Sequence, residues 1–269
     1  MSRTYPAGGR KGECWHDAPV TTDVLASLGE LPGVFEAADS ARAAIDGLLR
    51  EPALRRSRGE VRAASRRRSA WASAQLEGAD PVDVAAFDPP FGDDESGRLA
   101  AGSLRISGEI RSLSDTWRQA PLQALARLHT LAAADVVAPD SLGRPRVGPG
   151  VTARLSGLAD TVTSSQASGV VVAAVVQGEL LDVAPFEWGN GLIARAASRL
   201  VLVSRGVDPD ALTVPEEGLL LLGLERYEAA LSGYRSGAPE GVAGWLVHIA
   251  ASVQQGATIA RTLCSSATA

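Results

Sequence analysis

The chain has 269 residues, and 45% of them are hydrophobic, which is typical of a globular protein and excludes a disordered one. Its formal net charge of −5 gives it no overall attraction for nucleic acid or for an anionic membrane surface. The apolar run at residues 170–176 is far too short to span a bilayer. We therefore expect neither nucleic acid nor a membrane among its partners.

The start of the chain is rich in Gly and Pro, which predicts an extended or partly disordered arm over residues 1–33. Residues 1–10 lack the apolar stretch of a secretory signal. The two cysteines, Cys14 and Cys264, show neither a metal-binding nor a redox spacing. We therefore expect the reducing environment of the cytoplasm.

Two helices are predicted next. Residues 36–50 carry apolar side chains at helical spacing, and residues 53–76 form a longer helix. Its part from Arg55 to Arg68 contains seven arginines. These indicate either a face for an acidic partner or nucleic acid, or a solvated face in a chain that uses Arg almost to the exclusion of Lys. The negative net charge favours the solvated face.

The rest of the chain alternates between loops and helices. Residues 80–95 and 135–150 are rich in Pro, Asp or Gly and predict loops. Helices are predicted over 96–117, 122–134, 151–163, 167–181, 192–203, 215–234 and 239–263. The valines at 170–176, taken alone, suit a strand equally well. Because no alternating strand and helix pattern occurs, an all-α bundle is the consistent architecture.

Residues 184–195 read Ala-Pro-Phe-Glu-Trp-Gly-Asn-Gly-Leu-Ile-Ala-Arg. The Gly-Asn-Gly at 189–191 predicts a tight turn that opens a helix, because glycine tolerates positive φ. The first N–H groups of a helix lack internal partners and can hold a phosphate. Arg195, about one turn further on, can reach the same anion with its forked guanidinium. Alternatively, the tripeptide is only a turn and Arg195 only a structural ion pair.

A second motif precedes the first loop, where residues 72–78 read Ala-Ser-Ala-Gln-Leu-Glu-Gly. Ser73 and Glu77 are four residues apart and share one face of the predicted helix. Gly78 is placed to end that helix. Taken alone, Ser73 and Glu77 indicate an exposed helix face.

Together the two motifs resemble the Fic (Fido) family. Its active-site motif is His-Pro-Phe-x-(Asp/Glu)-Gly-Asn-Gly-(Arg/Lys)-x-x-Arg, and its inhibitory helix carries (Ser/Thr)-x-x-x-Glu-(Gly/Asn). Weaker matches lie between them, at the Leu128-His129 pair and at the Gly-x-x-Arg turn of residues 143–146. Family members are usually adenylyltransferases that move AMP from ATP onto a target hydroxyl.

The resemblance implies an all-α, Fic-type helical bundle with an N-terminal helical extension that carries the inhibitory helix. It also implies a helix for residues 167–181. The expected organisation is an arm over 1–33, a helical segment with the inhibitory motif over 34–95, a Fic-like core over 96–235 and a C-terminal helix over 236–269.

The resemblance also implies losses. Ala184 stands at the position of the catalytic His, Trp188 at that of the acidic metal ligand, and Leu192 at that of the first Arg. Removing a general base costs on the order of 10² to 10⁴ in rate. Removing the carboxylate takes away charge neutralisation at the phosphates. Glu187 lies one position early and is not a replacement. We therefore expect no catalytic residue and no metal site here, with the Trp188 indole filling the vacated space rather than stacking on a base or a partner.

The other residues of the two motifs match the family. The expected anion- or nucleotide-binding residues are Gly189, Asn190, Gly191 and Arg195. The expected inhibitory residues are Ser73, Glu77 and Gly78. In the family this Glu pairs with the last Arg of the active-site motif and blocks the γ-phosphate of ATP, so the resemblance implies a contact between Glu77 and Arg195. If that pair is buried, breaking it costs about 3–5 kcal/mol, so stability alone can preserve it.

Three functions follow as hypotheses. The first is a pseudoenzyme that acts as a binding or regulatory module for an unknown protein partner; many relatives form homodimers, so a homodimer is also an expectation. The second is a sensor of a nucleotide or phosphate, gated by Glu77. The third is a residual adenylyltransferase in which another group replaces the lost base. The only cofactor implied is ATP, without a well-formed magnesium site.

Overall fold

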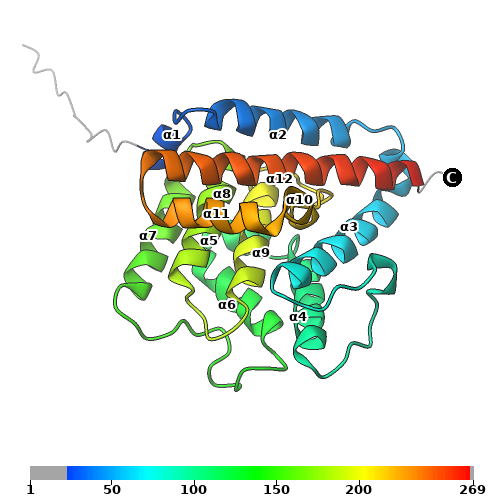
Figure 1. The fold of residues 1–269 in the computed structure, drawn as a ribbon, viewed down its shortest axis with the longest axis horizontal. Coiled ribbons are helices and arrows are strands. Elements are labelled where there is room, and N and C mark those ends of the chain that lie inside the picture. Colours follow the sequence, from blue (N-terminus) through cyan, green and yellow to red (C-terminus); the bar gives the residue numbers. More distant parts are fainter. Residues whose placement is uncertain (1–22, 267–269) are drawn as a thin grey trace, which may run out of the picture.

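The computed structural model describes residues 23–266 of the chain. This part folds into twelve α-helices and one short 3₁₀ helix, and it contains no β-strand (Figure 1). The all-α class predicted from the sequence is therefore confirmed. The valine-rich stretch at 170–176, which alone suits a strand equally well, lies within helix α8 (Gly169–Val183). Cys14 lies outside the described residues.

The N-terminal part begins with a short helix in place of the arm expected there. Its elements are α1 (Val24–Leu28), α2 (Val34–Leu49), α3 (Leu54–Leu76) and the 3₁₀ helix η1 (Val84–Ala86). The Asp23 carboxylate caps α1 by accepting hydrogen bonds from the N–H groups of Leu25 (3.1 Å) and Ala26 (3.2 Å). Leu25 is buried, so this segment packs onto the bundle. The rest of the expected arm, residues 1–22, lies outside the described residues.

The single helix expected over 96–117 is two helices. The elements of this part are α4 (Glu95–Glu109), α5 (Ser114–Gln119) and α6 (Pro121–Ala132). Between α4 and α5 the chain makes a turn in which Ile110 and Leu113 are both buried. The Ser112 hydroxyl donates to the Glu109 carbonyl oxygen (2.9 Å), and such local hydrogen bonds compete with the helix. Tertiary packing and this bond together account for the break.

The C-terminal half supplies the rest of the bundle. After α8, its elements in chain order are α9 (Asn190–Ser204), α10 (Pro215–Leu222), α11 (Leu224–Arg235) and α12 (Pro239–Ser266); α7 (Val151–Ser164) precedes α8. The single helix expected over 215–234 is divided at Gly223, whose φ of 97° is open to glycine and strained for other residues. The remaining helices begin and end within a few residues of their predicted bounds.

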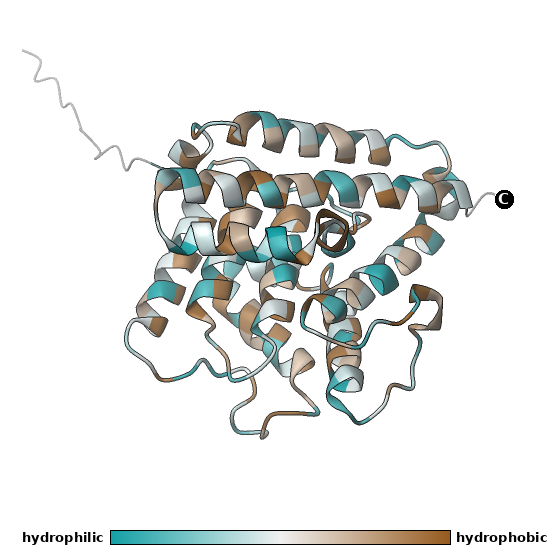
Figure 2. Ribbon diagram, viewed as in Figure 1, coloured by the Kyte–Doolittle hydropathy of each residue, from teal (hydrophilic) through white to brown (hydrophobic). Residues whose placement is uncertain are grey.

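The helices pack around α8 and α9, which contact each other in the centre of the molecule (Figure 1). Helices α2 and α12 lie side by side along one edge, and apolar and polar residues alternate along both of them (Figure 2). Trp245 of α12 is fully buried and donates its indole N–H to the Ala174 carbonyl oxygen of α8 (2.8 Å). One cluster of buried apolar side chains extends from Leu25 to Ala257. The N-terminal helices, the central helices and the C-terminal helix therefore share one core.

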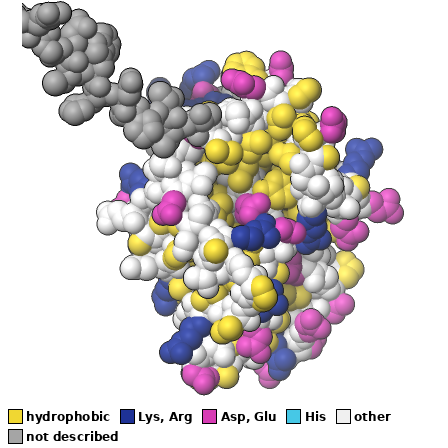
Figure 3. Space-filling model, turned by 90° about the vertical axis from the view of Figure 1, so that its left-hand side faces the viewer, with side chains coloured by type: hydrophobic (Ala, Val, Ile, Leu, Met, Phe, Trp, Pro, Cys, Tyr) yellow, Lys and Arg dark blue, Asp and Glu magenta, His cyan; other side chains and the backbone are white. Residues whose placement is uncertain are grey.

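The surface carries charges of both signs. On the face drawn in Figure 3, apolar side chains gather in the upper part, with acidic and basic side chains spread around them. Phe35 is the most exposed aromatic side chain among the described residues, with 68% of its surface accessible. None of the helices within residues 23–266 combines the length and the hydropathy that a membrane-spanning segment needs.

Candidate functional site

The chain leaves α8 through a tight turn over residues 184–189, the motif turn. It begins at Ala184, whose backbone is left-handed, with φ 42° and ψ 62°. Such a backbone is uncommon for a residue that carries a Cβ. Arg146 holds the turn in place: its backbone N–H donates to the Pro185 carbonyl oxygen (2.7 Å) and its Nε to that of Ala184 (2.9 Å). The Gly-x-x-Arg segment at 143–146 thus contacts the motif turn directly.

Asn190 closes the other end of the motif turn. Its Oδ1 accepts from the Phe186 N–H (2.9 Å), and its Nδ2 donates to the Phe186 carbonyl oxygen (2.9 Å). The sequence predicts Asn190 as an anion-binding residue. In the structure both ends of its amide are engaged with the backbone of the turn, so the amide fixes the shape of the loop.

Phe186 anchors the motif turn in the core. Its ring stacks on that of His129, with centroids 4.4 Å apart and planes inclined by 15°. His129 is fully buried, and its Nδ1 accepts a hydrogen bond from the Gly143 N–H (2.8 Å). Burial lowers the pKa of the imidazole, which favours its neutral form. His129, which belongs to the first of the two weaker sequence matches, therefore packs between the second match, at residues 143–146, and the motif turn.

The backbone where α9 begins lies against a carboxylate. Gly189, which precedes the helix, has a left-handed backbone (φ 72°) and supplies no side-chain cap. A Cβ on Gly191 would lie 1.8 Å from Oε1 of Glu77, so the Glu77 carboxylate rests directly on the Gly191 backbone. The start of a helix attracts a negative group. In this structure that group is the side chain of Glu77.

Arg195, one turn into α9, is bound on the same side. Its Nε donates to the Ser73 hydroxyl (2.9 Å), and its Nη2 donates to the Ser73 carbonyl oxygen (3.0 Å) and to Glu77 Oε1 (2.9 Å). The Arg195 side chain is only 2% exposed, whereas that of Glu77 is 24% exposed. Burial is the largest single influence and opposes the charge of the guanidinium, but Glu77 and Tyr227 together outweigh it and raise the pKa of Arg195.

Gly78 ends α3 and so fixes where Glu77 stands. Its φ is 94°, and its N–H donates to the Gln75 carbonyl oxygen (3.0 Å), while the Ala79 N–H donates to that of Ala74 (3.0 Å). This pair of hydrogen bonds is the Schellman arrangement, which glycine favours at this position. It holds Glu77 at the C-cap position, directly after the last residue of α3 and facing α9.

The positions at which the resemblance places a base and a metal ligand carry no such groups. Ala184 offers a methyl group where the motif of the resembled family has a histidine. Trp188 is partly buried and packs against the main apolar cluster, and Glu187 is exposed. Within residues 23–266, no group of three or more His, Cys, Asp and Glu side chains is placed to hold a metal ion. The residues of the motif turn therefore do not fit a magnesium ion, because the one carboxylate on the α9 backbone, that of Glu77, is bound to Arg195.

The predicted site residues thus fall into two groups. Ser73, Glu77, Gly191 and Arg195 meet between α3 and α9. The other three shape the backbone: Gly189 and Asn190 form the end of the motif turn, and Gly78 ends α3. Two contacts are not predicted by the sequence: the hydrogen bonds from Arg146 to the motif turn, and the hydrogen bond from Arg195 to the Ser73 carbonyl oxygen. Backbone acceptors leave no trace in a sequence pattern. The Gly-x-x-Arg match at 143–146 marked Arg146 but did not indicate which atoms it binds.

Comparisons with known proteins identify the fold. No model of a protein family matches the chain, and no curated protein matches it in sequence. Solved structures do match. The chain is similar to a Fic family protein from Desulfovibrio desulfuricans G20, with a TM-score of 0.71 and 16% identity over 86% of this chain and 74% of that one.

Two further solved structures agree. Fic-1 from C. elegans matches with a TM-score of 0.64 and 18% identity over 85% of this chain and 73% of that one. A Fic domain containing signaling protein from Bacteroides thetaiotaomicron matches with a TM-score of 0.59 and 14% identity over 86% of this chain and 98% of that one. The chain therefore has the fold of Fic proteins, and the resemblance drawn from its two motifs is confirmed at that level.

Proposed function

We propose that this chain is a Fic-family protein that lacks efficient transfer of AMP and acts as a binding or regulatory module for a protein partner, most simply in the cytoplasm. The observation that carries the proposal is an asymmetry within one site. The contact of Ser73 and Glu77 with Arg195, for which the resemblance implies an inhibitory role, is formed, while the position expected for the base holds the methyl group of Ala184.

The energies favour this interpretation. A missing general base costs on the order of 10² to 10⁴ in rate, and the missing carboxylate at position 188 adds to that loss. The contact between α3 and α9, in contrast, stabilises the folded protein whether or not the protein is catalytic. Breaking one partner away from a buried charge costs about 3–5 kcal/mol, and Arg195 is 2% exposed. Stability therefore explains why this contact persists in a site without its chemical groups.

A transfer assay tests the proposal. Wild type, Glu77→Gly and Glu77→Gly/Arg195→Ala are incubated with Mg²⁺ and ATP labelled on the α-phosphate, alone and with cell extract, after circular dichroism has shown each protein to be folded. We expect no label on any protein. Labelling by Glu77→Gly that disappears with Arg195→Ala would contradict the proposal and establish the residual adenylyltransferase.

A nucleotide or phosphate sensor is the second candidate, and one observation favours it. Glu77 lies where an anion would bind at the start of α9, yet its side chain is 24% exposed and is followed by Gly78, which has open space around it. A carboxylate in that position can be displaced by a phosphate without moving the core. The Glu77 side chain then acts as a gate.

Calorimetric titration of ATP, with and without Mg²⁺, separates the two candidates. Binding that is tighter in Glu77→Gly than in wild type supports the sensor. Glu77→Gln, which keeps the hydrogen bond to Arg195 and loses the charge, checks that the gain comes from charge removal. Absence of binding in all three folded proteins supports the interaction module.

A further inference from the structure

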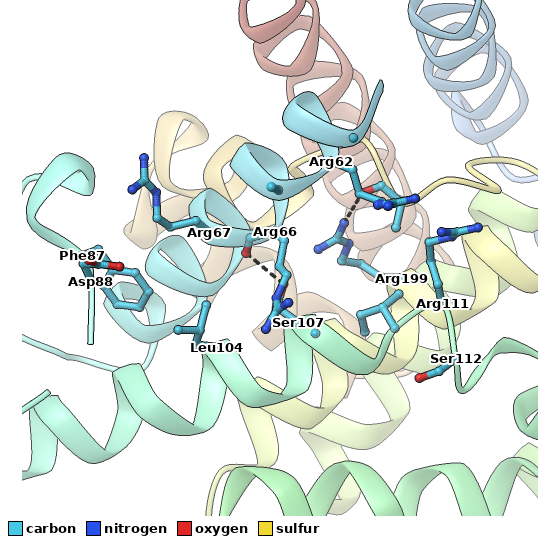
Figure 4. A pocket seen from close by; sticks show the side chains of 15 residues that line it. Arg62, Arg66, Arg67, Phe87, Asp88, Leu104, Ser107, Arg111, Ser112 and Arg199 are labelled. Carbon is cyan, nitrogen blue, oxygen red and sulfur yellow. Dashed lines mark hydrogen bonds between the residues drawn. The ribbon is translucent and has the colours of Figure 1, made fainter. Parts of the chain in front are cut away.

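A cavity of about 620 Å³ lies between α3 and α4, away from the motif turn (Figure 4). The charged side chains that line it are almost all positive. Five arginines line it, and Asp88 is the single acidic residue among the lining side chains. The arginines are Arg62, Arg66, Arg67, Arg111 and Arg199. This concentration of positive charge stands out in a chain whose net charge is −5.

Two of the five arginines already have partners. Arg199 is buried and donates to the carbonyl oxygens of Ala211 (2.9 Å) and Thr213 (3.1 Å). Arg111 lies 3.9 Å from a carboxylate oxygen of Asp210, which Arg58 also contacts. Arg199 also lies 3.9 Å from a carboxylate oxygen of Glu216, so carboxylates of the chain offset the charges of both guanidinium groups.

The other three, Arg62, Arg66 and Arg67, form no ion pair within residues 23–266. Arg62 is half-buried and the other two are exposed. The Arg66 guanidinium lies over Gly108 of α4, where an added Cβ would be 2.7 Å from its Nη2. Figure 4 shows the Arg62 side chain extending from α3 toward Arg111 and the Arg66 side chain extending toward Ser107, whereas Arg67 points away from both. Glycine at position 108 thus leaves room for an arginine that has no counter-charge.

Keeping these charges together is unfavourable in the absence of an anion. Arg62 and Arg66 are four residues apart on one helix face, a spacing at which like charges repel. A cleft lined by one sign of charge also focuses the field and raises the local concentration of ions of the opposite sign. The chain has 31 acidic residues, yet only Asp88 lines this cavity. The charges are therefore left to be neutralised by something outside the chain.

We propose that this cavity binds a small anion that carries two or more linked phosphate groups. Guanidinium forks bind phosphate oxygens bidentately, and several forks around one space favour several phosphates over one. Leu104 and Ile110 add apolar walls, and a cavity of this volume accommodates a ligand of nucleotide size. A nucleoside polyphosphate and an inorganic polyphosphate share this chemistry. The site is independent of the proposed function, which rests on α9.

Calorimetry with sodium tripolyphosphate, ATP and inorganic phosphate at low salt tests the proposal. The test variant is Arg62→Gln/Arg66→Gln. The matched control is Arg55→Gln/Arg56→Gln, which removes the same charge from exposed positions of the same helix that do not line the cavity. We expect tripolyphosphate to bind wild type more tightly than phosphate does, to lose at least about tenfold in the test variant and to change by less than about twofold in the control.

The outcomes are distinct. Equal affinities for tripolyphosphate and ATP identify the phosphate chain as the whole ligand, and tighter binding of ATP shows that the apolar walls hold its nucleoside; both support the proposal. No binding of tripolyphosphate at about 1 mM overturns it. Equal losses in test and control variants, or equal binding of a single-stranded oligonucleotide, overturn it in favour of a diffuse basic helix face. Binding at this cavity is unchanged by Glu77→Gly, whereas binding at α9 responds to Glu77→Gly and not to the arginine variants.

Discussion

The carboxylate of Glu77 and the backbone of Gly191 are in direct contact, because a Cβ at position 191 would lie 1.8 Å from Glu77 Oε1. The two residues come from helices far apart in the sequence, α3 and α9. Their contact places the negative side chain at the start of α9 and holds it within 2.9 Å of Arg195.

Gly191→Ala is expected to destabilise the protein by about 1–3 kcal/mol, because the new methyl group displaces the Glu77 carboxylate. In a Glu77→Gly background the same substitution meets no carboxylate. There it is expected to be neutral or to stabilise by up to about 1 kcal/mol, as alanine for glycine does in a helix. Urea denaturation of the four proteins of this double-mutant cycle measures the difference. Additive effects would show that the two residues are not coupled.

Removing Glu77 is expected to cost more than removing a surface carboxylate. Glu77→Ala leaves the buried Arg195 charge without its counter-ion, which predicts a loss of about 3–5 kcal/mol in the free energy of unfolding. Ser73→Ala removes one hydrogen bond and is expected to cost about 1–3 kcal/mol. The control is Glu51→Ala, whose pair with Arg261 is largely exposed and is worth less than about 1 kcal/mol. A smaller loss for Glu77→Ala than for Glu51→Ala would contradict a structural role of the pair.

The fully buried His129 and the partly buried His248 predict a dependence of stability on pH. The pKa values of His129 and His248 are lowered, mainly by burial, from an ordinary value of 6.5. The unfolded state therefore binds protons more readily than the folded state, so stability is greatest above pH 6.5 and decreases as the pH falls below it. Unfolding by urea at pH values from about 7.5 to about 5 measures this decrease.

His129→Asn is expected to remove part of that decrease. The asparagine keeps an acceptor near the Gly143 N–H but cannot be protonated in this range. His248→Asn serves as its matched control and is expected to remove the share of the second histidine. If both variants retain the slope of the wild type, the histidines are not its cause.

Restoring the missing groups tests whether the scaffold is otherwise intact. In a background of Glu77→Gly, Trp188→Asp and Leu192→Arg, the further change Ala184→His is expected to raise transfer of labelled AMP by on the order of 10² to 10⁴. Ala184→His alone is expected to have no such effect, because the carboxylate for the metal is still missing and Glu77 is still bound to Arg195. The assay is label incorporated into the protein itself or into cell extract, with circular dichroism as the check on folding.

The sequence predicted the larger features well because they depend on local signals. Helix periodicity, Pro at helix starts and the two motifs located most helices and the Fic fold. The turn between α4 and α5 contains neither Gly nor Pro, so the local sequence does not indicate a helix break there. The break follows from the burial of Ile110 and Leu113. The helical pattern over residues 215–234 predicts one helix, because a single glycine within such a pattern does not by itself indicate a break; in the structure the helix is divided at Gly223.

The site was predictable in its partners but not in its geometry. The spacing of Ser73 and Glu77 and the resemblance together pointed to Arg195, and these side chains meet as expected. The use of the Asn190 amide within the motif turn depends on a backbone conformation that the sequence does not specify. The sequence favours a solvated face for the arginines of α3. Three of them line a cavity, which becomes apparent only from the packing of α4 against α3.

The left-handed backbone at Ala184 determines which side chains this position accepts. Alanine gains nothing from a φ of 42°, whereas histidine occurs in this region of backbone conformation several times more often than most residues do. The turn therefore suits a histidine at least as well as it suits alanine. An imidazole could enter by substitution at this single position, with no backbone rearrangement to accompany it.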